Sequence, residues 1–354
     1  MNFVSLLKHT KILSKLNVCY TRSICGLFED RTPPVVDTDT KVTVVGSGKV
    51  AAACAMSLLV QNISDNVVLL DNKNANRLNG EVLDMQHGSL FFSSQVRGTT
   101  DYKETANSKI CILSIGCKGA HTKQEVIDLA QKNIDGFKKI LPQILTFSPN
   151  IILLIISNPV DIMTYVAWKI SSLPINKIIG IGTTLDSARF SQQISHKLGI
   201  PPRNCQAYII GGHNLYPVPV WSSISLVGDR LIELNPHVGT DQDKEKWHEV
   251  YEAAINSPKQ ITEGKGNTCW AKGLAAAAIV KSIFQNTRDI YTVTTNLKNL
   301  HGISYDVFLS LPCVLNACGI HKVVIQQLND KEKEQLLKCA EKNKKVADCI
   351  KICG

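Results

Sequence analysis

Three side chains suited to proton transfer and carboxylate binding occur in two short segments of this sequence. Asp186 and Arg189 stand three residues apart, so on a helix they would share a face and could line one cavity. His213 follows two glycines after the strand-like run Tyr208–Ile210. A histidine can exchange a proton near neutral pH, a carboxylate can hold its tautomer, and an arginine fork matches a carboxylate. Together they suit hydride transfer between a 2-oxo and a 2-hydroxy acid; singly, each is more often a surface pair or a loop residue.

A fourth polar residue ends another apolar run. Asn158 follows Ile151–Ile156 and precedes a proline. Its amide could bond to a substrate or to the ribose of a nicotinamide cofactor, whereas Asn-Pro alone is usually only a turn. The residue is therefore a candidate for both substrate binding and cofactor binding.

A glycine-rich turn near residue 46 predicts a dinucleotide site. Gly46, Gly48 and Ala51 form the spacing G-x-G-x-x-A between a predicted strand and a predicted helix. Such a turn lets the backbone approach a pyrophosphate, which the helix N-terminus stabilises. Asp71 lies 20 residues after Ala51, at the end of the next apolar run. A carboxylate there accepts the ribose hydroxyls and repels a 2′-phosphate, so we expect NAD rather than NADP.

The apolar runs define the elements that must position these residues. Strands are expected at 41–46, 67–70, 110–115 and 151–156, with a helix at 50–59. Their alternation predicts an α/β fold, a Rossmann doubly wound parallel sheet. From about residue 181 the pattern is more mixed, which indicates an α+β substrate domain. We expect an NAD-binding Rossmann domain at 41–182 and a C-terminal catalytic domain at 183–354.

Composition narrows the possible partners. The chain has 354 residues, 44% of them hydrophobic, and a formal charge of +9 that is too scattered to predict nucleic-acid binding. No apolar run reaches the ~18 residues of a membrane-spanning helix, so we expect no membrane partner. The 12 cysteines include no C-x-x-C pair, which favours reduced thiols and no metal site.

Residues 1–27 differ from the rest of the chain. They contain Lys8, Lys11, Lys15 and Arg22, several hydroxyl residues, and no Asp or Glu. This composition is typical of a mitochondrial transit peptide. The alternative is a surface arm of a cytoplasmic protein, so residues 1–40 are interpreted as an N-terminal arm or a transit peptide.

Longer strings resemble the L-lactate dehydrogenases of the lactate/malate dehydrogenase family. They occur at 80–89, 157–169, 185–190, 239–247 and 306–313, and the resemblance covers roughly residues 41–345. It implies that His213 is the proton donor and acceptor, with Asp186 as its partner. It also implies that Arg189, Asn158 and Thr268 bind the substrate. The implied assembly is a homotetramer, and the implied reaction interconverts pyruvate and lactate with NAD.

One departure from the family concerns a mobile loop. In the family this loop supplies an arginine that polarises the substrate carbonyl. Here the loop, Cys117–Val126, contains no arginine, and none occurs between Gly98 and Ala188. Aligned without a gap, Val126 takes the place of the arginine, and Lys123 is the nearest possible substitute. We therefore expect attenuated activity, because a lysine does not reproduce the guanidinium fork.

A second departure flanks the histidine. The family usually has Glu-His-Gly-Asp, whereas this chain has Gly212-His213-Asn214, closer to the malate dehydrogenase version. Two alternatives follow from these departures. One is a non-catalytic NAD-binding relative that acts as an assembly partner, and the other is a dehydrogenase of another 2-hydroxy acid.

Overall fold

The computed structural model describes residues 40–116, 123–213 and 216–352. The predicted arm or transit peptide at 1–27 and most of the loop lacking the arginine, 117–122, lie outside the described residues. The same holds for Asn214 and Leu215, directly after His213.

The N-terminal half forms a parallel sheet with strand order β3-β2-β1-β4-β5-β6. Its inner strands are apolar runs such as Ile-Leu-Leu-Ile, as expected for strands covered by helices on both faces. The edge strand at Gln95–Thr99 is more polar and more exposed. The register pairs Val42 with both Val67 and Ile110. The strands are β1 (Val42–Val45), β2 (Asn66–Leu70), β3 (Gln95–Thr99), β4 (Ile110–Leu113), β5 (Ile152–Ile155) and β6 (Ile178–Gly180). This is the predicted Rossmann arrangement.

The same sheet continues into the C-terminal half. β12 pairs antiparallel with β6, and β13, β8 and β9 follow it, with β14 on β13. The second half is thus an α+β region, as predicted, but it shares its sheet with the first. The added strands are β8 (Ile209–Gly211), β9 (Pro217–Pro219), β12 (Ile290–Asn296), β13 (Phe308–Asn316) and β14 (Gly319–Val323). A small separate sheet contains β7 (Cys205–Gln206), β10 (Ser225–Leu226) and β11 (Asp229–Arg230).

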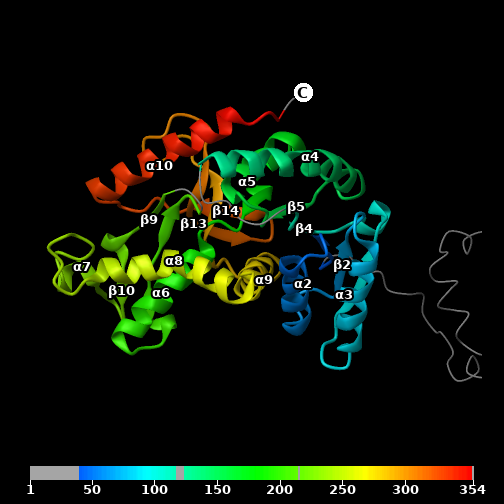
Figure 1. Ribbon diagram of the computed structural model, residues 1–354, viewed down its shortest axis with the longest axis horizontal. Helices are drawn as coiled ribbons and strands as arrows, with labels where there is room; N and C mark the ends of the chain where they lie inside the picture. The colour runs from blue at the N-terminus through cyan, green and yellow to red at the C-terminus, as the bar shows by residue number, and fades with distance from the viewer. Residues whose placement is uncertain (1–39, 117–122, 214–215, 353–354) are drawn as a thin grey trace, which may run out of the picture. The chain divides into compact units, whose positions relative to one another are not determined.

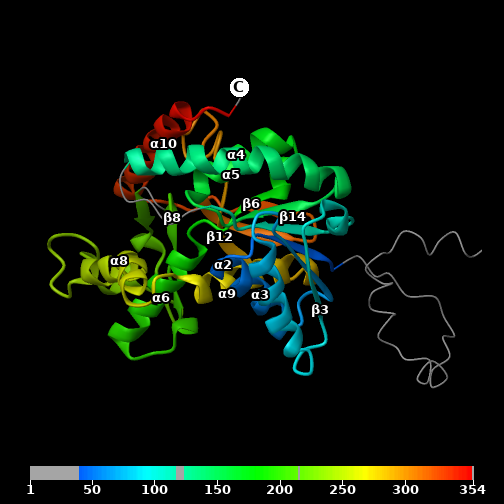
Figure 2. The same ribbon diagram turned by 45° about the vertical axis from the view of Figure 1, so that its right-hand side comes forward.

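Helices cover both faces of the large sheet. In Figures 1 and 2, α4, α5 and α10 lie on one side, and α2, α3, α6, α8 and α9 lie on the other. Their bounds are α2 (Lys49–Val60), α3 (Ala75–His87), α4 (Lys123–Phe147), α5 (Val160–Ser171), α6 (Thr184–Leu198), α7 (Leu231–Leu234), α8 (Trp247–Lys265), α9 (Cys269–Gln285) and α10 (Asp330–Cys349). The helices pack their apolar faces on the sheet, and this packing fixes the positions of the strand ends.

The predicted site residues follow the carboxyl ends of strands. Gly46 follows β1, Asp71 follows β2 and Asn158 follows β5. In a parallel sheet these ends meet at one edge, where ligands of such folds bind. β8 ends two residues before His213 and lies in the antiparallel extension of the same sheet.

Candidate functional site

His213 and Asp186 are in direct contact, although 27 residues separate them in the sequence. Nδ1 of His213 lies 2.5 Å from Oδ2 of Asp186. The histidine follows β8, and the aspartate belongs to the first turn of α6. Their side chains are only 14% and 8% exposed. The structure thus brings together the residues predicted to be the proton donor and its partner.

Arg189 binds the other oxygen of the same carboxylate. Its NH1 donates to Oδ1 of Asp186 at 2.8 Å. Burial alone would raise the pKa of Asp186, but the charges and hydrogen bonds of His213 and Arg189 outweigh burial and hold that pKa below its ordinary value. Asp186 is therefore an ionised acceptor, so Nδ1 of His213 carries a hydrogen. Nε2 of His213 remains available to exchange a proton with a substrate.

The start of α6 forms hydrogen bonds with β8, the strand that leads to His213. The Thr183 hydroxyl donates to the carbonyl oxygen of Ile209 at 2.5 Å. The Ser187 hydroxyl oxygen accepts the N–H of Ile209 at 2.9 Å. Because these bonds tie the helix to the strand on both sides of the first turn, they fix the spacing of the carboxylate and the imidazole.

A second buried carboxylate, Asp161, holds the backbone of His213. It lies in the first turn of α5 and is 3% exposed. Oδ2 accepts the backbone N–H of His213 at 2.9 Å, and Oδ1 accepts the Thr294 hydroxyl at 2.7 Å. Burial raises the pKa of Asp161 to about 6, although both of these hydrogen bonds act to lower it.

Sequence reasoning missed Asp161. The available signal was an acidic residue at the start of an apolar helix, Val160–Ser171, because such residues are rarely buried without partners. Its partners come from β12 and from the turn after β8, which sequence spacing alone does not bring together.

The two remaining predicted substrate residues lie at element boundaries. Asn158 follows β5 and is half-buried, and its backbone oxygen accepts a hydrogen bond from Asn133 at 2.7 Å. Thr268 is the N-cap residue of α9, also half-buried, and its hydroxyl makes no capping bond. The structure gives no direct bond from either side chain to the cluster of His213, Asp186 and Arg189. Their substrate roles therefore stay predictions.

The glycine turn after β1 leaves room for an anion at the start of α2. Gly46 has a φ of +106°, and a Cβ there would lie 2.7 Å from the backbone oxygen of Ser114. At Gly48 a Cβ would meet nothing within 4 Å, so the space beside this residue is open. No side chain caps α2 and its first turn has no acidic residue, which leaves its N–H groups for a phosphate. Ala51 is fully buried, as close packing of the helix on the strand requires.

Asp71, after β2, lies next to the glycine turn at the position predicted to bind the adenosine ribose. Its Oδ2 accepts the backbone N–H and the hydroxyl of Ser47, at 3.0 and 2.7 Å. Its Oδ1 accepts the N–H groups of Lys73 and Asn74, at 2.9 and 3.2 Å. Burial acts to raise the pKa of Asp71, but these hydrogen bonds outweigh it and lower the pKa. The ionised carboxylate can accept ribose hydroxyls, so the residues present fit NAD.

Two sequence profiles together match nearly all of the described chain. The first, lactate/malate dehydrogenase NAD binding domain, covers residues 40–180. The second, lactate/malate dehydrogenase alpha/beta C-terminal domain, covers residues 183–352. The chain belongs to the lactate/malate dehydrogenase family. The predicted family is confirmed, and NAD is the cofactor of this family member.

The family member is also similar to individual vertebrate proteins over most of its length. It is 45% identical to the L-lactate dehydrogenase A chain of Cyprinus carpio over 302 residues, which are 85% of this chain and 90% of the relative. It is 43% identical to the L-lactate dehydrogenase B chain of Homo sapiens over 314 residues, 88% of this chain and 92% of the relative. With the B chain of Bos taurus the identity is 43% over 321 residues, 89% and 96% of the two chains.

Val126, which aligns with the loop arginine of the family, is buried. Val126 lies in the first turn of α4, is 1% exposed, and belongs to the main hydrophobic core. Its neighbour Glu125 is exposed. Replacing Val126 with arginine would therefore place a guanidinium in the core rather than over a substrate.

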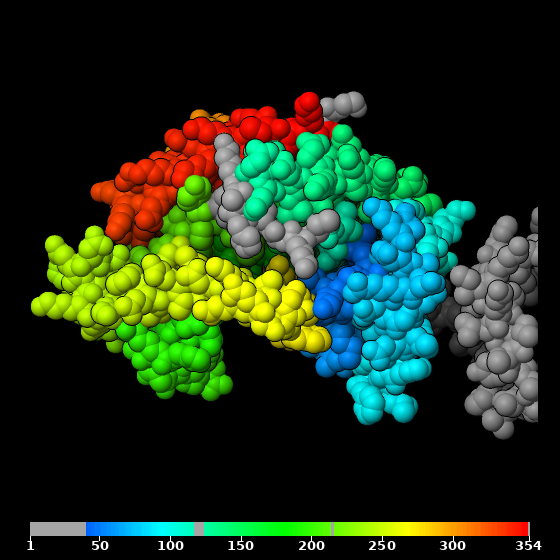
Figure 3. Space-filling view, viewed as in Figure 1, coloured from blue at the N-terminus to red at the C-terminus, as the bar shows by residue number. Residues whose placement is uncertain are grey.

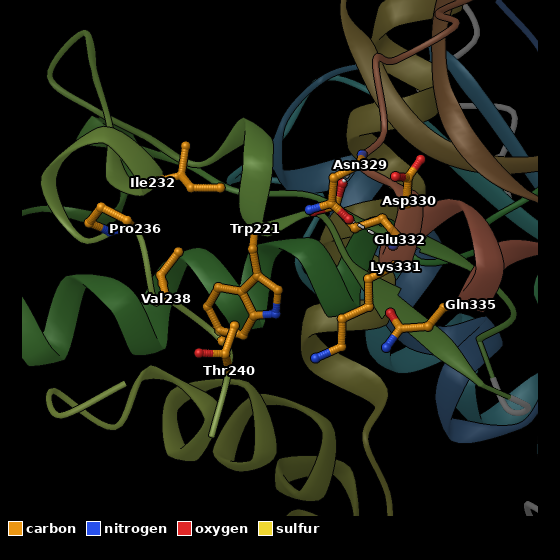
Figure 4. Close-up of a pocket in the computed structure, with 11 residues that line it drawn as sticks. Trp221, Ile232, Pro236, Val238, Thr240, Asn329, Asp330, Lys331, Glu332 and Gln335 are labelled. Atoms are coloured by element: carbon orange, nitrogen blue, oxygen red, sulfur yellow. Dashed lines mark hydrogen bonds between the residues drawn. The ribbon is translucent and has the colours of Figure 1, made fainter. Parts of the chain in front are cut away.

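A hollow of about 340 Å³ lies elsewhere, between Trp221 and the start of α10 (Figure 4). None of the predicted site residues lines it. Its wall contains the bonds that anchor α10: Glu332 accepts the N–H and hydroxyl of Ser222 at 2.9 and 2.7 Å, and it forms a capping box with Asn329. The hollow thus marks the anchoring of a helix, and the chemistry lies at the cluster of His213, Asp186 and Arg189.

Two other features bear on the predicted partners. Within the described residues, no group of three or more His, Cys, Asp or Glu side chains is placed to hold a metal ion. None of the described helices combines the length and apolar character needed to cross a membrane.

Proposed function

We propose that this chain is an NAD-dependent L-lactate dehydrogenase that interconverts pyruvate and lactate and is slower than relatives with a loop arginine. The observation that carries the proposal is the buried cluster in which Asp186 bridges His213 and Arg189. It combines a proton carrier, the group that orients it, and a cation for a carboxylate. Identity of 43–45% to L-lactate dehydrogenases supports the choice of substrate.

In the proposed reduction of pyruvate, Arg189, His213 and Asp186 have different roles. Bound NADH supplies the hydride. Arg189 holds the substrate carboxylate with the guanidinium donors that Asp186 does not use, since one N–H goes to Asp186 in this structure. His213 donates the Nε2 proton to the substrate oxygen, and the charge of Asp186 stabilises the imidazolium before that transfer. Oxidation of lactate runs through the same groups in reverse.

The reduced rate is inferred from the missing loop arginine. Loss of one preorganised donor to the developing oxyanion typically lowers a rate by ~10²–10³. Enzymatic accelerations commonly exceed ~10⁶, so the remaining groups still leave substantial catalysis. We therefore expect a slow enzyme with an intact proton-transfer pair.

Single-turnover oxidation of bound NADH by pyruvate, with lactate measured as product, tests the proposal. We expect slow oxidation that is lost in His213→Asn, with Asp229→Asn at the exposed β11 as a matched surface control. NADH binding without oxidation by pyruvate would overturn it. A panel of other 2-oxo acids would then separate a different substrate from a non-catalytic assembly partner.

We also propose that the chain assembles as a homotetramer. The proposal rests on family membership and on large apolar side chains left exposed on neighbouring helices. Trp270 and Leu274 of α9 are 66% and 57% exposed, and Val60 of α2 is 57% exposed. Light scattering during size-exclusion chromatography measures the mass of the assembly. Four chains are expected, fewer in Trp270→Lys, and a monomeric wild type would refute the idea.

We further propose that residues 1–27 direct the chain to mitochondria. The proposal rests on their four basic residues and their lack of acidic ones. The full-length chain with a C-terminal tag should co-fractionate with mitochondria, and a variant with glutamate at positions 8, 11 and 15 should not. Equal distribution of both chains outside mitochondria would refute import.

A further inference from the structure

A lysine that the sequence patterns did not single out lies between the cofactor and substrate elements. Lys272 is on α9, four residues after Thr268, so the two side chains share one face of the helix. It is half-buried and lies between the buried residues Cys269 and Gly273. Its charged end is therefore directed into the protein interior rather than into bulk water.

The surroundings of Lys272 come from both halves of the chain. α9 packs closely on α2, because a Cβ on Gly273 would lie 2.4 Å from the backbone oxygen of Ala53 (Figure 3). Burial lowers the pKa of Lys272; the nearby charge of Arg189 lowers it further, whereas Asp186 and Cys54 raise it. Cys54 belongs to the cofactor helix α2, and Asp186 and Arg189 belong to α6. The ammonium is thus close to both helices.

Lys272 has no carboxylate of its own. Within the described residues, the structure gives it no hydrogen bond and no ion pair, while Asp186 is already shared by His213 and Arg189. A buried cation without a partner is costly, and such groups are retained mainly where a ligand or a reaction uses the charge. The enclosed charge therefore points to a role in the site.

The residues that would hold the cofactor and the substrate indicate where the nicotinamide ring would lie. The pyrophosphate of the cofactor fits the turn at Gly46 and Gly48, and the hydride must reach a carbon whose oxygen meets His213 and whose carboxylate meets Arg189. A nicotinamide ring held by these residues would lie between the start of α2 and the first turn of α6. Lys272 is on α9, which contacts both α2 and α6, and the charges of Asp186 and Arg189 on α6 act on it.

We propose that Lys272 makes the site select the reduced cofactor by placing a positive charge beside the nicotinamide ring. The inference rests on the proposed NAD-dependent function. An oxidised ring carries a positive charge and a reduced ring is neutral, so the ammonium repels only the oxidised form. The charge favours NADH in the binary complex and speeds the departure of NAD⁺ after reduction. A unit charge several ångströms away in a partly buried site changes the relative affinity on the order of 10-fold.

The dissociation constants of NADH and NAD⁺, measured by calorimetry on the full-length chain, test this inference. Lys272→Met removes the charge and keeps the length of the side chain, and Lys272→Arg keeps the charge. Lys281→Met, exposed on the same helix, is the matched control. In Lys272→Met we expect NAD⁺ to bind about 10-fold more tightly relative to NADH. Lys272→Arg and Lys281→Met should keep the wild-type ratio.

Other outcomes would overturn the inference. An unchanged NAD⁺/NADH ratio in Lys272→Met would show that the charge does not act on the ring. Weaker binding of oxamate, an unreactive analogue of pyruvate, at an unchanged ratio would place the charge on the substrate instead. Failure of the wild type to bind NADH or NAD⁺ would refute the proposed function itself. If the wild type binds both, but Lys272→Met has the same ratio of NAD⁺ to NADH affinity as the wild type, only the role of Lys272 is refuted.

Discussion

Asp186→Asn removes the charge that His213 and Arg189 share while almost preserving the side-chain shape. Asp186 accepts from Nδ1 of His213 at 2.5 Å and from NH1 of Arg189 at 2.8 Å. An asparagine has a single acceptor oxygen, so its NH₂ must face one of these two donors. If the oxygen stays on Arg189, the amide donates to Nδ1 of His213. The hydrogen of the neutral imidazole then moves to Nε2, and this tautomer cannot take a proton from lactate.

The expected loss follows from that tautomer. The equivalent change in an acid–base pair of this type lowers turnover by ~10⁴, and we expect ~10³–10⁴ here. This corresponds to about 4–5 kcal/mol of transition-state stabilisation. NADH binding should change little, because Asp186 does not belong to the glycine turn or to the adenosine end.

Stopped-flow single turnover in both directions measures this effect. Each preparation is first checked for folding by circular dichroism and for NADH affinity by calorimetry. Asp229→Asn, on the surface, should match the wild type in every measurement. A folded Asp186→Asn protein that binds NADH and reacts within about threefold of the wild type would refute the role of the shared carboxylate.

Three further predictions concern stability. The pKa of Asp161 is raised to about 6, above its value in the unfolded chain. Between pH 4 and pH 6 the folded protein therefore binds more protons at this group, and the free energy of unfolding should fall by about 3 kcal/mol as the pH rises. Urea titrations at each pH should show this fall in the wild type and not in Asp161→Asn. Glu332→Ala leaves three N–H or O–H donors without their acceptor and should lower the free energy of unfolding by about 2–4 kcal/mol, whereas exposed Glu334→Ala on the same helix should change it little. Val126→Arg should destabilise the fold by several kcal/mol in thermal melts and Glu125→Arg by less than about 1 kcal/mol; a stable, faster Val126→Arg enzyme would contradict this.

Much of the fold could be predicted because its signals are local. Most of the parallel strands are short apolar runs, whereas the edge strand β3, Gln-Val-Arg-Gly-Thr, is not. The glycine spacing and Asp71 stand at the ends of two of these runs. The continuation of the sheet through β12 was not predictable, because antiparallel pairing between Thr294 and Gly180 depends on tertiary packing rather than on a periodic pattern. The expected boundary at 182/183 therefore falls within one shared sheet.

The site could be predicted only where residues carry a recognisable spacing. Asp186, Arg189 and His213 stand in short motifs, and the structure brings them into contact. Asp161 lies within the string 157–169 but was not singled out there, and Lys272 stands in no motif. Their positions are set by which helix packs on which strand, and a charged residue within an apolar helix does not indicate its partner.

An arginine placed at position 126 and the native Lys272 would both be cations in a buried environment, but their surroundings differ. At position 126 an arginine would meet apolar side chains of α4 and the sheet, with nothing to stabilise its charge. Lys272 also lacks a carboxylate of its own, but the charge of Asp186 acts on it, and α9 contacts the helices α2 and α6 that carry the cofactor and catalytic residues. Burial disfavours this charge in the free protein, and under the proposed role an uncharged, reduced ring beside it is favoured over an oxidised one. This chain lacks the loop arginine but keeps a second fixed cation in its site, and that cation distinguishes the two oxidation states of the cofactor.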